Sequence, residues 1–219
     1  MLPTYPHINI IYMNTVNTNL TRIPLSLMYI RLALGFLIIF LSYSQTTFFR
    51  IIIVSLIFLG LLTDIFDGII ARRLNISSQK LRRMDSSIDQ AFWICCLIGT
   101  WMICPEFFKA NSEKLLIILI VEGLTYVVSY LRFGKEVATH AIMSKIWTLS
   151  IMAAIIQVVL SCNSFILFEL CFYIGIISRL EIIGILFILK EWTNDVPSIY
   201  HAILIRQGKE IKRHKLLNG

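Results

Sequence analysis

Six long apolar runs constrain the fold of this chain more than any other feature. Short polar connections separate runs at about 24–44, 50–70, 86–104, 114–131, 146–161 and 165–189. Each run is near the roughly 20 residues that an α-helix needs to cross the hydrocarbon of a bilayer. Hydrophobic residues make up 57% of the 219 residues and charged residues 15%, which is too apolar for a soluble protein of this size. The sequence therefore predicts an all-α, polytopic membrane protein with six transmembrane helices.

We expect a single membrane domain over residues 1–219, with a distinct segment at each end. Residues 1–21 are polar, rich in Thr and Asn, and lack the basic-then-apolar layout of a signal peptide. In the tail, 195–219, apolar residues such as Ile199 and Ile203 alternate with basic ones. This pattern fits either a helix lying in the membrane interface or a solvated basic tail, and the sequence does not separate the two.

The basic residues gather on one side of the expected membrane. The first, third and fifth connections are almost bare of Lys and Arg, whereas the second and fourth carry Arg72, Arg73, Lys80, Arg82, Arg83, Arg132, Lys135 and Lys145. Because positive residues stay on the cytoplasmic side, we expect a multi-pass protein of the bacterial inner membrane with both termini in the cytoplasm. The net charge of +7 then indicates contact with anionic lipid headgroups rather than with nucleic acid.

The five cysteines carry no clear chemical signal. Cys95, Cys96, Cys104, Cys162 and Cys171 lie in or next to apolar segments and show no paired metal-ligand spacing. We interpret them as small buried hydrophobic residues rather than as redox or zinc-binding groups.

Four aspartates flank the second connection. Asp64 and Asp67 are spaced i, i+3 and share a helix face with Ala71, while Asp85 and Asp89 are spaced i, i+4 on the next helix. Two helices joined by so short a basic turn would be antiparallel. All four carboxylates are therefore predicted to point into one gap, with the active site on the cytoplasmic side.

Carboxylates at the edge of a bilayer are costly and normally functional. Four ionised carboxylates in one gap would repel one another, and a divalent cation removes that conflict. Ligands that offer only oxygen suit Mg²⁺, Mn²⁺ or Ca²⁺ rather than Zn²⁺. The alternative interpretation is that these residues are interfacial charges paired with the neighbouring arginines.

The same stretch matches a longer motif, D-x-x-D-G-x-x-A-R, then eight residues, then G-x-x-x-D-x-x-x-D. The matching residues are Asp64, Asp67, Gly68, Ala71, Arg72, Asp85 and Asp89, and one position departs because Leu81 replaces the second glycine. This motif resembles that of the class I CDP-alcohol phosphatidyltransferase (CDP-alcohol phosphotransferase) family. Pro24 and Arg31 also resemble the opening of the first membrane helix in many relatives. Arg31 itself we expect at the headgroup level, either snorkelling or as an anchor at the helix start.

The resemblance implies an enzyme of phospholipid biosynthesis. It would transfer a phosphatidyl group from a CDP-linked lipid such as CDP-diacylglycerol to a small alcohol and release CMP. Two Mg²⁺ or Mn²⁺ ions would bridge the diphosphate, and a homodimer is implied. By the same resemblance the metal ligands are Asp64, Asp67, Asp85 and, at the edge, Asp89, which is also the general base. The CDP-binding residues would be Asp64, Gly68, Ala71 and Arg72, and Leu81 puts the cytidine side of that pocket in doubt.

The acceptor alcohol stays open. Residues 144–148, S-K-I-W-T, resemble the G-K-x-K-T of relatives that use phosphate-bearing acceptors such as glycerol 3-phosphate, with Ser144 and Trp147 as departures. Lys145, Arg132 and Lys135 are the candidate acceptor-binding residues. Ser86, directly after Asp85, instead resembles serine-using relatives. Glycerol 3-phosphate, inositol phosphate, serine and other alcohols are all compatible with these residues.

Two other classes of function remain compatible with the sequence. A small-solute transporter could also place carboxylates in a membrane gap, but the chain shows no internal repeat. A catalytically silent, lipid-binding relative is the second alternative, and retention of all four aspartates argues against it. Within the later runs, Arg179 with Glu181 is expected to form structural pairs with other helices rather than to contact substrate.

Overall fold

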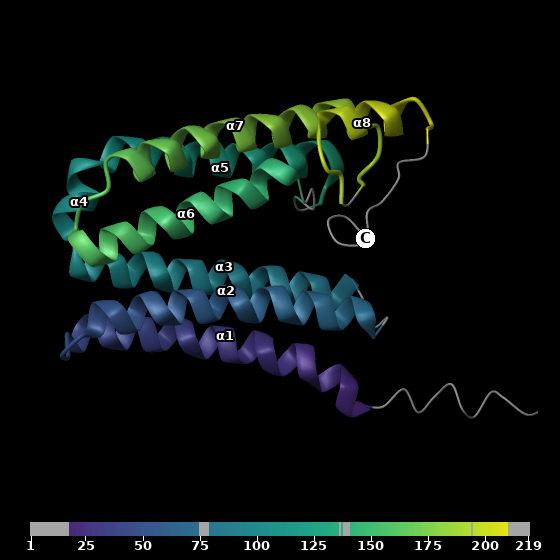
Figure 1. The fold of residues 1–219 in the computed structure, drawn as a ribbon. Helices are drawn as coiled ribbons and strands as arrows, with labels where there is room; N and C mark the ends of the chain where they lie inside the picture. The colour runs from purple at the N-terminus through teal and green to yellow at the C-terminus, as the bar shows by residue number, and fades with distance from the viewer. Residues whose placement is uncertain (1–17, 75–78, 136, 138–140, 194, 210–219) are drawn as a thin grey trace, which may run out of the picture. The chain divides into compact units, whose positions relative to one another are not determined.

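The computed structural model describes residues 18–209 except 75–78, 136, 138–140 and 194, and within its helices it leaves undescribed the side chains of 18–22, 72, 79–80 and 82–83. All regular elements in these residues are α-helices (Figure 1). The segment 1–17 and the tail residues 210–219 lie outside the described residues.

Six of the eight described helices are long and apolar enough to cross a membrane, which confirms the predicted fold class. They are α1 (Thr18–Ser44), α2 (Phe49–Arg73), α3 (Gln79–Ile103), α5 (Ser112–Phe133), α6 (Ile142–Ser161) and α7 (Ile166–Ile188). Two short helices, α4 (Pro105–Ala110) and α8 (Ile199–Arg206), complete the described chain. The chain is therefore an integral, multi-pass membrane protein.

The helices extend beyond the apolar runs that predicted them. α3 begins at Gln79, seven residues before the apolar run, and it contains both Asp85 and Asp89, as their spacing predicted. α6 begins at Ile142, which puts Lys145 on a helix and not in a polar connection. Such extensions arise because intrahelical hydrogen bonds need no apolar side chains, so a helix continues past the edge of the hydrocarbon. Two further helices were not predicted from hydropathy: α4, and α8 as a regular helix within the tail.

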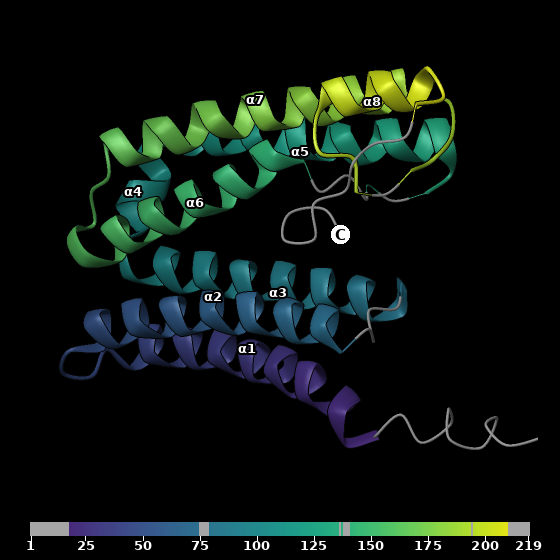
Figure 2. The same cartoon turned by 45° about the vertical axis from the view of Figure 1, so that its right-hand side comes forward.

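The described chain groups into two compact units, Met1–Met102 and Ile103–Gly219. In the first unit α1, α2 and α3 run side by side (Figures 1 and 2). Glycines allow the close approach: a Cβ at Gly60 of α2 would overlap the Phe92 ring of α3, and one at Gly35 of α1 would meet Cys95 at 3.1 Å. The core of this unit thus depends on large α3 side chains seated on small residues of α1 and α2.

In the second unit α5 and α6 both pack against α7, and α8 lies beside the C-terminal end of α7 (Figure 2). Its buried cluster joins Ile182, Ile185, Leu186 and Leu189 at that end of α7 to Ala141, Val196 and Ala202. α5 ends at Gly134, whose φ of 62° is the left-handed conformation that glycine adopts without steric cost. The apolar residues of the tail that precede 210 therefore help to cover α7; whether α8 lies in the membrane interface stays a prediction.

Two of the five cysteines were interpreted wrongly from sequence. Cys104 and Cys162 form a disulfide, with Cα atoms 5.2 Å apart. The other three, Cys95, Cys96 and Cys171, are free and buried, as expected of small apolar residues. The pairing joins residues 58 apart that directly follow α3 and α6, so only the packing of the connections reveals it.

Candidate functional site

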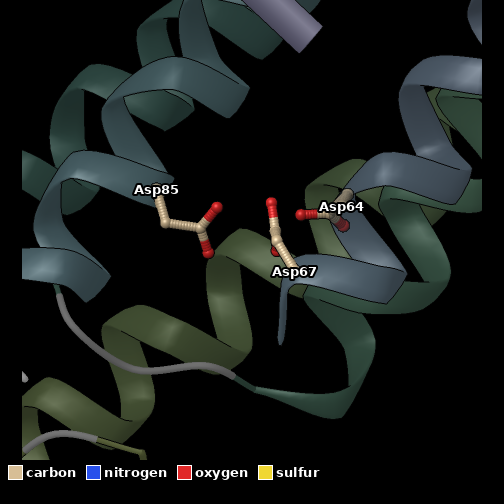
Figure 3. Close-up of side chains that lie close together, drawn as sticks. All are labelled: Asp64, Asp67 and Asp85. Carbon is tan, nitrogen blue, oxygen red and sulfur yellow. The ribbon is translucent and has the colours of Figure 1, made fainter. Parts of the chain in front are cut away.

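Carboxylates from two helices meet in the first unit. Asp64 and Asp67 project from α2 and Asp85 projects from α3, and each offers an oxygen within 4.8 Å of the others (Figure 3). The spacing of three residues places the two α2 carboxylates on one face. The two helices thus bring together the three residues that the motif predicted as principal metal ligands.

The carboxylates differ in their exposure. The Asp67 side chain is 1% exposed, whereas those of Asp64, Asp85 and Asp89 are 39%, 29% and 31% exposed. Asp67 Oδ1 is buried and has no hydrogen-bond partner among the described residues. A buried carboxylate oxygen without a partner is costly, so this atom is suited to a cation ligand.

Arg31 of α1 lies among all four aspartates. Its Nη1 atom is 3.0 Å from Asp64 Oδ1 and 3.3 Å from Asp85 Oδ1. The guanidinium also forms ion pairs with Asp67 through Nη2 and with Asp89 through Nη1. The side chain is 1% exposed, so the expectation that Arg31 snorkels to the headgroups is wrong. The physical reason is that four carboxylates supply, inside the protein, the counter-charge that the headgroups would otherwise supply.

One signal in the sequence pointed to this role for Arg31. It lies within the apolar span Ile23–Ser44, where an ionisable residue is expensive unless it has a partner. The identity of that partner was not readable, because it depends on how α1 packs against α2 and α3. Thr63 Oγ1, 3.5 Å from Arg31 Nε, is a further neighbour of the guanidinium that the sequence did not indicate.

The residues of this site fit a hard divalent cation. Three carboxylates with mutually close oxygens, one of them buried and unpartnered, form an oxygen-only donor set. Asp89 is not part of that close group and is joined to it through Arg31. The roles of three central ligands and one edge residue stay a prediction.

The predicted CDP-binding residues lie along the same stretch of α2. Ala71 is buried, and Gly68 is half-buried one residue after Asp67. Arg72 lies in the last turn of α2, but its side chain is outside the described part of the structure. Leu81, which replaces the motif glycine, is half-buried in the first turn of α3. Of the two small residues, Gly68 is therefore the one that leaves the α2 backbone partly accessible close to the carboxylates.

The predicted acceptor-binding residues lie in the second unit. Arg132 donates a hydrogen bond to the Leu189 carbonyl oxygen at 3.0 Å, and Lys135 Nζ lies 4.8 Å from the centre of the Trp192 ring. Lys145 is exposed in the first turn of α6. Arg132 and Lys135 thus have contacts within the protein that tie them to the end of α7.

A second charge cluster, half-buried, lies within the second unit. Arg179 of α7 forms an ion pair with Glu122 of α5, and its guanidinium carbon lies 4.3 Å from the centre of the Trp147 ring. Gly175, one turn before Arg179, makes room for that ring, since a Cβ there would press against the indole. Arg179 therefore pairs with another helix, as expected, but its partner is Glu122. Glu181 Oε2 is buried with no hydrogen-bond partner among the described residues.

Comparison with known proteins assigns the family. The family model of the CDP-alcohol phosphatidyltransferases matches residues 21–191, which include both charge clusters and all six spanning helices except the first residues of α1. No curated protein and no solved structure gives a match. Because the family model covers well over half of the 219 residues, the chain belongs to the CDP-alcohol phosphatidyltransferase family, whose members transfer a phosphatidyl group from a CDP-linked alcohol.

Proposed function

We propose that this protein transfers the phosphatidyl group of CDP-diacylglycerol to a small alcohol and releases CMP, with divalent ions held by the aspartate cluster. The observation that carries the proposal is the meeting of Asp64, Asp67 and Asp85, whose oxygens lie within 4.8 Å of one another in a chain of this family. The unpartnered, buried Oδ1 of Asp67 supports an ion at this place.

The aspartates would hold the ions, with Asp64, Asp67 and Asp85 as principal ligands and Asp89 at the edge. Bound Mg²⁺ or Mn²⁺, two ions by analogy with the family, would neutralise charge on the donor's diphosphate. Gly68 and Ala71 have side chains small enough for the nucleotide to approach α2. Arg72 is proposed to pair with the diphosphate as a planar donor.

Asp89 is proposed as the general base. Its carboxylate would take the proton from the acceptor hydroxyl while the hydroxyl oxygen forms a bond to the phosphorus that carries the lipid. The bond from that phosphorus to the CMP oxygen breaks, and CMP leaves with the electron pair. Asp89 suits this role because it lies beside the central group and remains 31% exposed, so an acceptor can reach it.

The acceptor is proposed to be a small alcohol that carries a charged group. Lys145 is the strongest candidate to bind that group, because it is exposed on α6. Arg132 and Lys135 are weaker candidates, since the contacts of Arg132 with Leu189 and of Lys135 with Trp192 give them a structural role. A phosphorylated alcohol would use Lys145 directly, and serine would offer its carboxylate.

A CMP-release assay tests the function. Purified protein in detergent with Mg²⁺ should release CMP from CDP-diacylglycerol only when the right alcohol is present, and the panel should contain glycerol 3-phosphate, inositol phosphate and serine. Asp67→Asn is the matched inactive control. Binding of CDP-diacylglycerol without CMP release for any acceptor would favour a silent lipid-binding relative. Movement of solute across vesicles without CMP release would favour a transporter.

We also propose that the aspartate cluster faces the cytoplasm of a bacterial inner membrane. The basic second and fourth connections support this orientation. The disulfide supports it independently: Cys104 follows the end of α3 opposite to Asp85, and disulfides persist in oxidising compartments. A cysteine introduced at Ser78, in a background without the three free cysteines, should react with an impermeant thiol reagent only when the inner face is open. Labelling in intact cells would reverse the assignment.

The homodimer implied by the family also stays a proposal. Light scattering of the purified protein, corrected for bound detergent, should give twice the mass of the 25.3 kDa chain. A monomer mass at working concentration would contradict it.

A further inference from the structure

Arg31 contacts all three of the carboxylate groups that a divalent ion would need. Its Nη1 atom lies 3.0 Å from Asp64 Oδ1 and 3.3 Å from Asp85 Oδ1, and its Nη2 atom pairs with Asp67 Oδ2. These three aspartates are also the group whose oxygens are close enough to hold a metal ion. The guanidinium therefore pairs with every carboxylate of the proposed ion site.

When a guanidinium and a divalent ion bind the same carboxylates, each weakens the interaction of the other with them. Mg²⁺ requires near-octahedral oxygen ligands at about 2.0–2.1 Å, so an ion on Asp64 Oδ1 and Asp85 Oδ1 would compete with Arg31 Nη1 for these two atoms. Two cations within a few ångströms of each other also repel strongly in a site of low dielectric constant. The 1% exposure of Arg31 leaves little water to screen that repulsion.

We propose that Arg31 is a positioning residue that competes with divalent ions for the aspartate cluster. It holds the four carboxylates close together. An ion binds only when the ion pairs of the guanidinium with Asp64 and Asp85 break. The released guanidinium stays next to the ions, where an anionic diphosphate would bind. This inference rests on the metal site of the proposed function, and it adds a coupling between ion binding and Arg31.

A purely structural counter-ion would behave differently. If Arg31 only keeps the carboxylates in place, its removal should let them move apart and should weaken ion binding. Competition predicts tighter ion binding instead, because removal of the guanidinium frees carboxylate oxygens that the ion would otherwise have to take from Arg31. The sign of the change in ion affinity therefore separates the two roles.

The experiment measures Mn²⁺ binding to the purified full-length protein without donor or acceptor, from the free Mn²⁺ signal in electron paramagnetic resonance. Arg31→Gln should bind Mn²⁺ at least about tenfold more tightly than wild type, the size expected when one charge-assisted contact no longer has to be displaced. Arg31→Lys should bind several-fold more tightly, because one ammonium cannot span four carboxylates. Arg50→Gln, in the first turn of α2, is the matched control and should not change the affinity.

Each outcome decides the proposal. Unchanged or weaker Mn²⁺ binding in Arg31→Gln would overturn it. If Arg31→Gln does not fold, the test uses Arg31→Lys. A Mn²⁺ affinity of Arg31→Lys equal to or weaker than that of wild type would also overturn the proposal. Binding by wild type with no gain in either variant removes this inference but leaves the proposed metal site intact. Absence of Mn²⁺ binding in all three proteins removes that metal site and this inference with it.

Discussion

Each unit has an arginine in one of its membrane-spanning helices, Arg31 buried and Arg179 half-buried, but the two arginines have very different partners. Arg31 pairs with four carboxylates, from Asp64, Asp67, Asp85 and Asp89. Arg179 pairs with one carboxylate, from Glu122, and stacks on the Trp147 ring. Among the described residues, Arg31 therefore has four carboxylate partners and Arg179 has one.

This difference distinguishes a site from a structural contact. In the second unit one guanidinium pairs with one carboxylate and lies against the Trp147 ring, which is the arrangement of a structural ion pair. The cluster in the first unit keeps three partly exposed aspartates and one buried, unpartnered oxygen. The first cluster is therefore suited to bind cations, which the proposed transfer from a CDP-linked donor would use.

Removal of metal should have the largest effect on activity of all the changes that distinguish the two clusters. Excess EDTA should abolish CMP release, and Mg²⁺ or Mn²⁺ should restore it, because the first cluster needs cations. The same ions should raise the melting temperature, since ligand binding favours the folded state. Glu122→Gln is the matched control in the second cluster and should keep the full metal response. Full activity in excess chelator would remove the distinction between the clusters.

Asp89→Asn should have the next largest effect. The change keeps the size and one oxygen that can accept from Arg31 but removes the basicity. It should lower kcat by about 10²–10⁴-fold while binding of CDP-diacylglycerol stays nearly intact. Turnover and donor binding should be measured on one sample at saturating Mg²⁺, with Asp64→Asn as the variant that loses both. Normal turnover, or donor binding lost in step with rate, would count against Asp89 as the base.

Breaking the ion pair of the second unit should affect stability and not chemistry. Arg179→Met leaves the Glu122 carboxylate without its partner and should cost roughly 3 kcal/mol of unfolding free energy. The double variant Arg179→Met, Glu122→Leu removes both charges and should recover most of that loss. Unfolding in mixed micelles measures the stability, and CMP release per folded molecule should be unchanged. A loss of turnover that the double variant fails to repair would instead give Arg179 a role at the site.

The smallest effect concerns Lys145, which tests whether the second unit contributes to substrate binding at all. If the acceptor carries a phosphate, Lys145→Ala should remove one charge-assisted contact and cost roughly 1.5–3 kcal/mol. The KM for the acceptor should therefore rise while the KM for the donor stays constant. Arg132→Ala, at a residue held by the Leu189 carbonyl, is the comparison variant. Unchanged acceptor kinetics would favour serine or another acceptor without a phosphate.

The sequence by itself determined the six spanning helices and the positions of the aspartates on them. Both follow from local rules: a helix needs about 20 apolar residues to span the bilayer, and residues three or four apart share a face. The motif then identified Asp64, Asp67, Asp85 and Asp89 as a group, and the structure brings the first three together.

Only the tertiary structure decided which distant side chains became partners. Arg31 lies 33 to 58 positions from its four aspartates, and Arg179 pairs with Glu122 rather than with Glu181 two residues away. Local sequence patterns do not predict the disulfide between Cys104 and Cys162 either. The physical reason is that such contacts depend on how helices rotate and pack against one another, and glycines such as Gly60 and Gly175 set that packing through contacts between helices.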